Sequence, residues 1–417
     1  MRRSPLLMLL LLSVICIVVV ISFSAMRWTR LQSDSVHTST HADGPYSTAQ
    51  AYLYYVLKDP RGFVIARAPE GSAHQPLSAP QTIIPIGSGF GTSSADAVLS
   101  LQLSPDGRYL AIDGTHPDVE WVWVFDTQQS KINLLPSDAQ GNFLRWLPGG
   151  NGHTFLYRPM FPVGPVPPAK AQAWRATLWQ VDAATGSHKG IDLGVPAANL
   201  VDAAPSPDGS RIVYSTTAGL SLGSDTWLVN SNGSARKHLF KNKGSQAINA
   251  LFSWSPNGKN IVYERLVDSA TPFLNAGLWL MNAQGTRSQR LADTDGGHGY
   301  APSWSPDSSK VAFIARTNPH DVQANVQSQA LQSAIDIVDI ASKKIYPVAS
   351  AQETGMQLNI NPAWTTDSTH ITFTALNAPN HVLGGTLHYW SVSAAAAQVH
   401  PSVTMLSTPI AHVVAVA

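Results

Sequence analysis

The sequence has few charged residues, and those it has almost cancel. Asp, Glu, Lys and Arg make up 13% of the 417 residues, against about 25% in an average soluble domain. The 27 Lys and Arg offset the 26 Asp and Glu, which leaves a formal net charge of +1. A chain this close to neutral has no overall attraction to polyanions, so we expect no nucleic-acid partner.

Cysteine chemistry is also missing. Cys16 is the single cysteine, so the chain can form neither an intramolecular disulfide nor a zinc site built on cysteines. The 14 His residues are scattered without a metal-binding spacing, and there is no H-E-x-x-H motif and no phosphate-binding loop. We therefore expect no metal, no cofactor and no catalytic residues.

What the sequence does have, near its N-terminus, is an uncharged apolar run at 6–25, LLMLLLLSVICIVVVISFSA. A helix of this length spans about 30 Å, the thickness of the hydrocarbon core of a bilayer. Arg2 and Arg3 favour a cytoplasmic N-terminus, although Arg27 and Arg30 follow the run. The run is longer than the core of a signal peptide, so an uncleaved signal anchor is favoured over a cleaved signal. Lipidation of Cys16 is a third alternative, and all three place the rest of the chain outside the cytoplasm.

We therefore divide the chain into four parts. Residues 1–5 are a cytoplasmic tip, 6–25 a transmembrane signal anchor, 26–48 a flexible linker rich in Ser, Thr and His, and 49–417 a globular part. The expected protein is single-pass, with the membrane as a partner through its N-terminal helix. If the apolar run is cleaved, the globular part is secreted or periplasmic.

A short unit recurs along the globular part. It stands at 101–112 (LQLSPDGRYLAI), 204–215 (APSPDGSRIVYS), 252–264 (FSWSPNGKNIVYE), 302–314 (PSWSPDSSKVAFI) and 362–374 (PAWTTDSTHITFT), with a degenerate copy at 144–157 (LRWLPGGNGHTFLY). Neighbouring copies are about 50 residues apart, which is the period of propeller repeats.

Each unit predicts two strands joined by a tight turn. Its Pro fixes φ at the second turn position, its Asp or Asn accepts hydrogen bonds from turn N–H groups, and its Gly supplies a positive φ. Ser308 and Ser368 replace that glycine, so we expect strain at both. Trp146, Trp254, Trp304 and Trp364 precede the turn at matching positions, and we expect them to pack between adjacent blades.

A third and a fourth strand follow each unit, which predicts an all-β propeller of four-stranded antiparallel blades. Six repeats begin at about Val98. Residues 51–77 look like a second and a third strand without a first, and the tail 402–417 contains the strand-like IAHVVAVA. If the tail supplies the missing strand, the ring closes with seven blades, which we favour. A six-bladed ring would require the N-terminal strands to join the last repeat.

The unit W-S-P-D-G-x-x-I-x-[FY] resembles the TolB-type, WD-like propeller repeat, which also occurs in the propeller domains of the dipeptidyl-peptidase and prolyl oligopeptidase families. Residues 291–315, LADTDGGHGYAPSWSPDSSKVAFIA, carry the likeness best. Nothing matches the α/β domain that precedes the propeller of a full TolB, a periplasmic partner in a membrane-linked complex. A peptidase would need a hydrolase domain after the propeller. The G-x-S-x-G match at 219–223 lies between two expected strands, so we interpret it as chance.

The connections between second and third strands, and those between blades, fall on one face of such a ring. They contain the long insertions, at 158–173, 267–276, 317–333 and 376–385, and long loops on a rigid scaffold are where binding usually occurs. Residues 321–333 are expected to form a short helix. The candidate binding residues on this face are Tyr157, Phe161, Trp174, His298, Tyr300 and His320.

We predict a non-catalytic scaffold of the cell envelope that binds a protein partner through this face. One alternative is a sensor propeller that binds an extracytoplasmic ligand or carbohydrate. The other is a hydrolase or lyase with its site in the central channel, which would need two or more carboxylates that converge there. The sequence does not indicate an oligomeric state.

Overall fold

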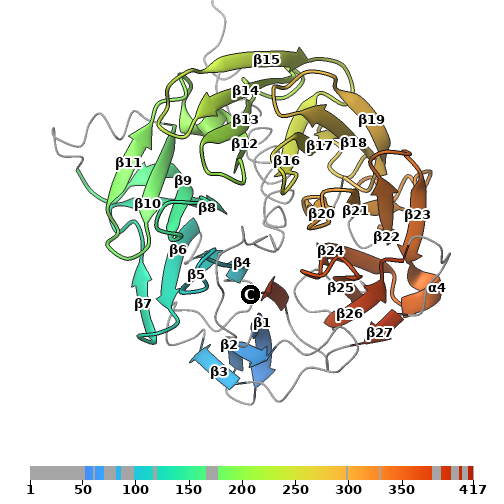
Figure 1. Ribbon diagram of the computed structural model, residues 1–417, viewed down its shortest axis with the longest axis horizontal. Helices are drawn as coiled ribbons and strands as arrows, with labels where there is room; N and C mark the ends of the chain where they lie inside the picture. The colour runs from blue at the N-terminus through green and yellow to red at the C-terminus, as the bar shows by residue number, and fades with distance from the viewer. Residues whose placement is uncertain are drawn as a thin grey trace, which may run out of the picture.

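The computed structural model describes residues 52–59, 62–69, 81–85, 98–115, 120–165, 177–296, 299–327, 330–377, 387–395, 403–405 and 412–416. These residues form seven four-stranded antiparallel sheets arranged as blades in a ring (Figure 1). The predicted cytoplasmic tip, signal anchor and linker at 1–48 lie outside the described residues. No helix within the described part of the chain is long and apolar enough to cross a membrane.

Six blades contain four strands that are consecutive in the chain. Blade 2 has β4 (Val98–Leu103), β5 (Tyr109–Thr115), β6 (Glu120–Asp126) and β7 (Lys131–Leu134), and blade 3 has β8 (Ala139–Trp146), β9 (Thr154–Pro162), β10 (Leu178–Asp182) and β11 (His188–Ile191). Blade 4 has β12 (Leu200–Pro205), β13 (Arg211–Thr216), β14 (Ser224–Asn230) and β15 (Lys237–Asn242). Blade 5 has β16 (Ile248–Trp254), β17 (Asn260–Leu266), β18 (Ala276–Asn282) and β19 (Gln289–Thr294). Blade 6 has β20 (Ser303–Trp304), β21 (Lys310–Arg316), β22 (Ser333–Asp339) and β23 (Ile345–Ala349), and blade 7 has β24 (Leu358–Trp364), β25 (His370–Leu376), β26 (Leu387–Ser393) and β27 (Val403–Met405).

Blade 1 combines the two ends of the chain. Its strands run in the order β28 (His412–Val416), β1 (Tyr52–Asp59), β2 (Gly62–Pro69) and β3 (Gln81–Pro85). β28 pairs with β1 in antiparallel register, with Leu53 opposite Val416. The prediction of a seven-bladed ring closed by the C-terminal tail is therefore confirmed, and the six-bladed alternative is wrong. The closure leaves β1 without an unpaired edge toward the centre of the ring.

The tight turns have the predicted chemistry. In blade 5 the Asn257 side chain accepts hydrogen bonds from Ser255 Oγ, at 2.8 Å, and from the backbone N–H of Lys259, at 3.0 Å. Gly258 has φ +67°. Ser308 and Ser368 stand at the same turn position with φ of 63° and 59°, so both non-glycine residues occupy the left-handed region.

The repeated Trp residues fill the spaces between blades, as predicted. Trp254 packs with Phe252 and Tyr263 of its own blade and with Ala204 and Val213 of blade 4. Its indole nitrogen donates to the carbonyl oxygen of Ala204 at 3.1 Å. Most of the apolar core accordingly lies between neighbouring blades.

The ring has two unlike faces, which we call the turn face and the loop face. The turn face has the connections between first and second strands and between third and fourth strands. The loop face has the connections between second and third strands and between blades. β1 is a second strand, so its start at Tyr52 lies on the turn face, and so does the end of β28 that pairs with it.

Candidate functional site

The loop face holds two long connections that pack on each other through Arg316, at the end of β21. Its guanidinium donates to the carbonyl oxygen of Phe273, at 2.5 Å, in the 267–275 loop of blade 5. It also donates to the carbonyls of Asn318, at 3.3 Å, and Asp321, at 3.2 Å, in the 317–332 loop of blade 6. Arg316, at the end of β21, is therefore hydrogen-bonded to both loops.

Apolar packing adds to this junction. The Phe273 ring is buried in a cluster with Ala324 and Leu331 of the 317–332 loop, and the backbone N–H of Phe273 donates to Asn325 O at 3.1 Å. A loop held by buried side chains and backbone hydrogen bonds presents a defined surface. The expected short helix at 321–333 is wrong for the described residues, because 322–326 forms consecutive turns.

A second junction joins blades 4 and 5. The two carboxylate oxygens of Asp268 accept hydrogen bonds from the backbone N–H groups of Ser221 and Gly223, each at 2.7 Å. Ser221 is the serine of the G-x-S-x-G match, and it lies in the connection between two strands, β13 and β14. A nucleophile elbow needs a strand followed by a helix, so this match is not one.

A buried carboxyl pair lies where blades 5 and 6 meet at the loop face. Glu264, in β17, is 2% exposed, and Asp295, in the connection that follows β19, is 3% exposed. Burial, and to a smaller extent the charge of Asp295, raise the pKa of Glu264 well above its usual range, while the hydroxyl of Thr294 opposes the shift. Burial also raises the pKa of Tyr300, and Asp295 adds to that shift.

The electrostatics of this pair extend to Arg316. Burial lowers the pKa of the Arg316 guanidinium, and the charges of Asp295 and Asp321 oppose that shift. Glu264, Asp295 and Arg316 are buried while Tyr300 and Asp321 are half-buried, so the charged centre of this group lies inside the junction of the two blades.

Exposed apolar side chains collect on the loop face. In the described part of the chain, the large apolar residues that stand exposed are Phe161, Val163, Leu222, Val322, Val326 and Ile345. All except Ile345 lie in, or at the end of the strand leading to, connections between second and third strands. Val322 is 76% exposed and Phe161 is 59% exposed. Exposed apolar side chains mark a contact surface where they form a contiguous patch, and these five lie on one face, on blades 3, 4 and 6.

The predicted binding residues divide into three groups. Phe161 and His320 are exposed on the loop face, and Tyr300 is half-buried beside the carboxyl pair. Trp174 and His298 lie outside the described residues. The prediction that Tyr157 lies on the loop face is wrong, because its side chain is fully buried and its hydroxyl donates to Ala139 O at 3.1 Å. The cause is that β9 continues to Pro162, beyond the expected start of the loop at 158.

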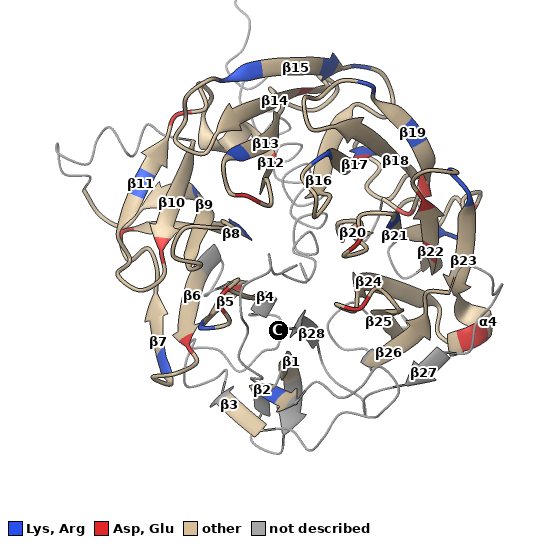
Figure 2. Ribbon diagram, viewed as in Figure 1, with Lys and Arg blue, Asp and Glu red and all other residues tan. Residues whose placement is uncertain are grey.

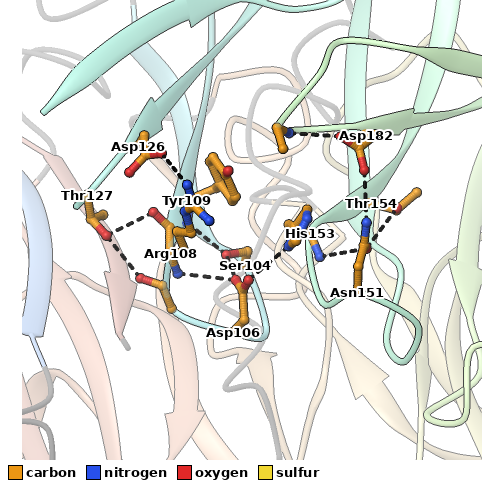
Figure 3. A network of polar contacts seen from close by, with 12 residues as sticks. Ser104, Asp106, Arg108, Tyr109, Asp126, Thr127, Asn151, His153, Thr154 and Asp182 are labelled. Atoms are coloured by element: carbon orange, nitrogen blue, oxygen red, sulfur yellow. Dashed lines mark hydrogen bonds and ion pairs between the residues drawn. The ribbon is translucent and has the colours of Figure 1, made fainter. Parts of the chain in front are cut away.

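The turn face has its own polar network between blades 2 and 3, shown in Figure 3. His153 Nδ1 lies 3.0 Å from Asp106 Oδ2, and Asp106 also accepts from the hydroxyl of Ser104. The carboxylate thus separates the serine from the histidine, which is not the order that activates a nucleophile. Asn151 Nδ2 donates to Asp182 at 2.8 Å. This network connects the turns of two blades, which is a structural role.

Metal binding finds no support in the ranges that the structure covers, where no group of three or more His, Cys, Asp or Glu is placed to hold an ion.

Comparisons with known proteins identify the fold alone. No protein-family model matches the sequence, and no curated protein matches it. Among solved structures, an oligogalacturonate lyase in complex with manganese aligns with a TM-score of 0.53 at 13% identity, over 82% of this chain and 85% of that one. TolB from Acinetobacter baumannii aligns at 0.44 and 16% identity, over 71% of this chain and 62% of that one. The propeller domain of the Trilobed protease from Pyrococcus furiosus aligns at 0.47 and 11% identity, over 88% and 95%.

The chain is thus a seven-bladed β-propeller with four-stranded blades. Its fold is TolB-like, as its repeat indicates, and it spans 62% of the length of the TolB chain with which it aligns. The oligogalacturonate lyase shares this fold at only 13% identity, so the fold leaves the activity undetermined.

Proposed function

We propose that this protein is a non-catalytic interaction scaffold of the cell envelope, which binds a protein partner through the loop face. The carrying observation is the position of the exposed apolar side chains: Phe161, Val163, Leu222, Val322 and Val326 all belong to this face. Their burial by a partner would be favourable by about 25 cal/mol for each Å² of apolar surface. The firm junction at Arg316 supports the proposal, because a pre-ordered surface loses less entropy on binding.

The proposed tether is the apolar run at 6–25, with the propeller outside the cytoplasm. Externally added protease should degrade the propeller in intact spheroplasts, and deletion of 6–25 should abolish its sedimentation with membranes. Protection from protease in intact spheroplasts would contradict the proposed location.

Serine substitutions on the loop face test the binding proposal. The variant Phe161→Ser/Val322→Ser/Val326→Ser removes three exposed apolar side chains without disturbing the buried core. We expect it to lose the partners that cross-link to the wild-type chain in native membranes. The matched control is Ile345→Ser, since Ile345 is exposed on the outer strand β23 and should retain them. Equal recovery of the same partners by both variants would contradict a binding role for the loop face.

The second candidate is an enzyme, and Glu264 with Asp295 is the observation that favours it. A pair of carboxyl groups is the usual requirement for acid–base cleavage of glycosidic bonds, and the oligogalacturonate lyase shares the fold. The assay follows new reducing ends, which hydrolysis and elimination both release from oligogalacturonate, and unsaturated product, which elimination alone releases, with the wild-type protein and with Glu264→Gln. Activity that Glu264→Gln abolishes would establish this candidate in place of the scaffold.

A further inference from the structure

Four cationic residues lie in or next to one turn on the turn face, at 283–288 between β18 and β19. The Arg211 guanidinium donates to Ala283 O at 3.1 Å, and Lys237 Nζ lies 3.5 Å from Gln284 O. Lys259 is adjacent through its carbonyl, which accepts from Ala283 N at 2.8 Å, and Arg287 belongs to the turn itself. We call Arg211, Lys237, Lys259 and Arg287 the basic patch.

The patch faces solvent. Lys237, Lys259 and Arg287 are exposed, and Arg211 is half-buried with its guanidinium 5.1 Å from the centre of the Trp254 ring. The patch includes residues of blades 4 and 5, at the rim where Figure 2 shows Lys and Arg on β15 and β19. It therefore forms on folding, from four separate segments of the chain.

The turns around the patch have lost the acids that other blades keep. Asp126 in blade 2 and Asp339 in blade 6 cap the turns after their third strands by accepting backbone N–H groups. In blade 5 the same position is Asn282, whose Oδ1 accepts from Thr286 N at 2.8 Å. Asn230 stands there in blade 4, and Asn257 replaces the Asp of the Ser-Pro-Asp-Gly turn in blade 5. The amide caps the turn as well as the carboxylate does, but it carries no charge.

These replacements leave the patch with little compensation. No Asp or Glu occurs between 226 and 263. Partial burial acts to raise the pKa of the Asp208 carboxyl, but hydrogen bonds from Ser206 and Ser210 and the charge of Arg211 together lower it below its usual value. The Asp225 carboxylate pairs with His238, at 2.9 Å, and with Lys241, at 3.3 Å, rather than with a residue of the basic patch. The four cations outnumber the nearby carboxylates, which are Asp208 beside Arg211 and Asp307 in the blade 6 turn whose Ser308 Oγ accepts from Asn257 N. The surface is therefore net positive on a chain whose overall charge is close to zero.

The turn face is also where the chain enters the propeller from its N-terminal side, at Tyr52. A segment of 26 residues, 26–51, separates that point from the apolar run at 6–25. If the segment is flexible, as predicted for the linker at 26–48, its average end-to-end distance is about 28 Å. The proposed tether would then hold the start of β1, which lies on the turn face, within a distance of this order from the bilayer.

We propose that the basic patch docks on the surface of a bilayer that contains anionic phospholipid, with the loop face directed away from the membrane toward its partner. The orientation rests on the tether of the proposed function, whereas the affinity of the patch for anionic lipid does not. The attraction acts over about one Debye length, roughly 8 Å at physiological salt, so it requires the turn face to lie flat on the headgroups.

The test uses residues 49–417, which contain every strand of the closed ring, so that the apolar run cannot contribute. Sedimentation is measured with vesicles of phosphatidylcholine alone and with vesicles that also contain phosphatidylglycerol. We expect binding only to the anionic vesicles, weakened by salt. Since one cation at an anionic surface changes affinity about fivefold, Lys237→Gln/Lys259→Gln/Arg287→Gln should lower it roughly hundredfold.

The control has the same charge change elsewhere on the turn face: Lys131→Gln/Lys343→Gln/Lys344→Gln. These lysines stand beside Asp126 or Asp339, so their loss should weaken binding less than tenfold. The proposal would be overturned if the wild-type protein did not bind anionic vesicles at low salt. It would also be overturned if the patch variant and the control variant lost the same amount of vesicle binding. Binding to an acidic polysaccharide but not to vesicles would overturn the assignment to lipid. The patch variant should keep the loop-face partner, and the loop-face variant should keep vesicle binding, so the two proposals can fail separately.

Discussion

The indole nitrogen of Trp364 donates a hydrogen bond of 3.0 Å to the carbonyl oxygen of Ser303 in the neighbouring blade. Trp304 makes the equivalent bond to Ser253 O at 3.0 Å, and Trp254 bonds to Ala204 O. Trp364 is 1% exposed, so the bond lies in a dry interface. The repeated Trp thus sets the contact between successive first strands by packing and by a hydrogen bond together.

Substitution of Trp364 separates these two contributions. Trp364→Phe keeps most of the ring but leaves the Ser303 carbonyl without its indole donor, and we expect a loss of about 1–3 kcal/mol in the free energy of unfolding. Trp364→Ala also leaves a cavity and should cost about 3–5 kcal/mol. Urea titration followed by circular dichroism measures both, with Ile345→Ser as an exposed control. A Trp364→Phe protein as stable as the wild type would show that the hydrogen bond contributes nothing.

Removal of Arg316 should release both long loops at once. Arg316→Ala takes away the donor to Phe273, Asn318 and Asp321, and we expect a cost of about 2 kcal/mol. Hydrogen exchange should accelerate in 267–275 and in 317–332, while β13 and β14 keep their protection. Arg316→Lys should restore only part of the protection, because an ammonium cannot reach three divergent carbonyls. Faster exchange in one loop alone would contradict a shared junction.

The pH dependence of stability should change at Asp336, in β22. Burial raises the pKa of its carboxyl from 3.8 to about 7. Between these two values the unfolded chain loses the proton while the folded chain keeps it, so this group makes the protein less stable as pH rises through that window. Asp336→Asn removes the effect. It should match the wild type near pH 4 and exceed it by an amount of the order of 4 kcal/mol at pH 8, since each unit of pKa shift is worth about 1.4 kcal/mol.

Thermal unfolding across this pH range measures the difference between the two proteins. The control is Ile345→Ser, which replaces an exposed side chain and removes no titratable group, so its difference from the wild type should not grow with pH. An Asp336→Asn protein whose advantage is constant from pH 4 to pH 8 would contradict the raised pKa.

Glycine should be tolerated differently at the two strained turns. Ser308 and Ser368 both have positive φ, which glycine adopts without steric cost. Ser308 Oγ also accepts a hydrogen bond from Asn257 N of blade 5, at 3.1 Å. We therefore expect Ser368→Gly to stabilise the protein by about 0.5–1 kcal/mol and Ser308→Gly to be close to neutral. Calorimetry of the two variants decides this, and a larger gain at 308 than at 368 would contradict it.

The fold was largely predictable because its signals are local. The residue types of a turn such as 255–258 are enough to predict it. The alternating apolar residues on either side of the turn then predict the two strands that it joins. The closing strand was predictable from a missing strand in the N-terminal segment and a surplus strand in the tail. One element was missed, the short helix α4 (Ala351–Thr354), although its capping box of Ser350 and Glu353 is a recognised signal of a helix start.

The candidate site was less predictable because its contacts join distant residues. Glu264 and Asp295 are far apart in the chain, and only the packing of blade 5 on blade 6 brings them together. Arg316 looks like an ordinary strand end until the loops that it joins are in place. Tyr157 was misplaced because its sequence does not show how far β9 extends. The basic patch shows the same limit, since its members come from four separate segments.

Site-specific photocrosslinking tests most directly whether the loop face binds a protein. A photoreactive residue is placed at Val322 on the loop face, at Ile345 on the outer strand or at Lys259 on the turn face, in the full chain in its native membrane. We predict that a protein adduct forms from Val322, that it is absent from Ile345 and Lys259, and that Phe161→Ser/Val326→Ser suppresses it. The same adducts from all three positions, or none from Val322, would contradict a scaffold that binds through its loop face.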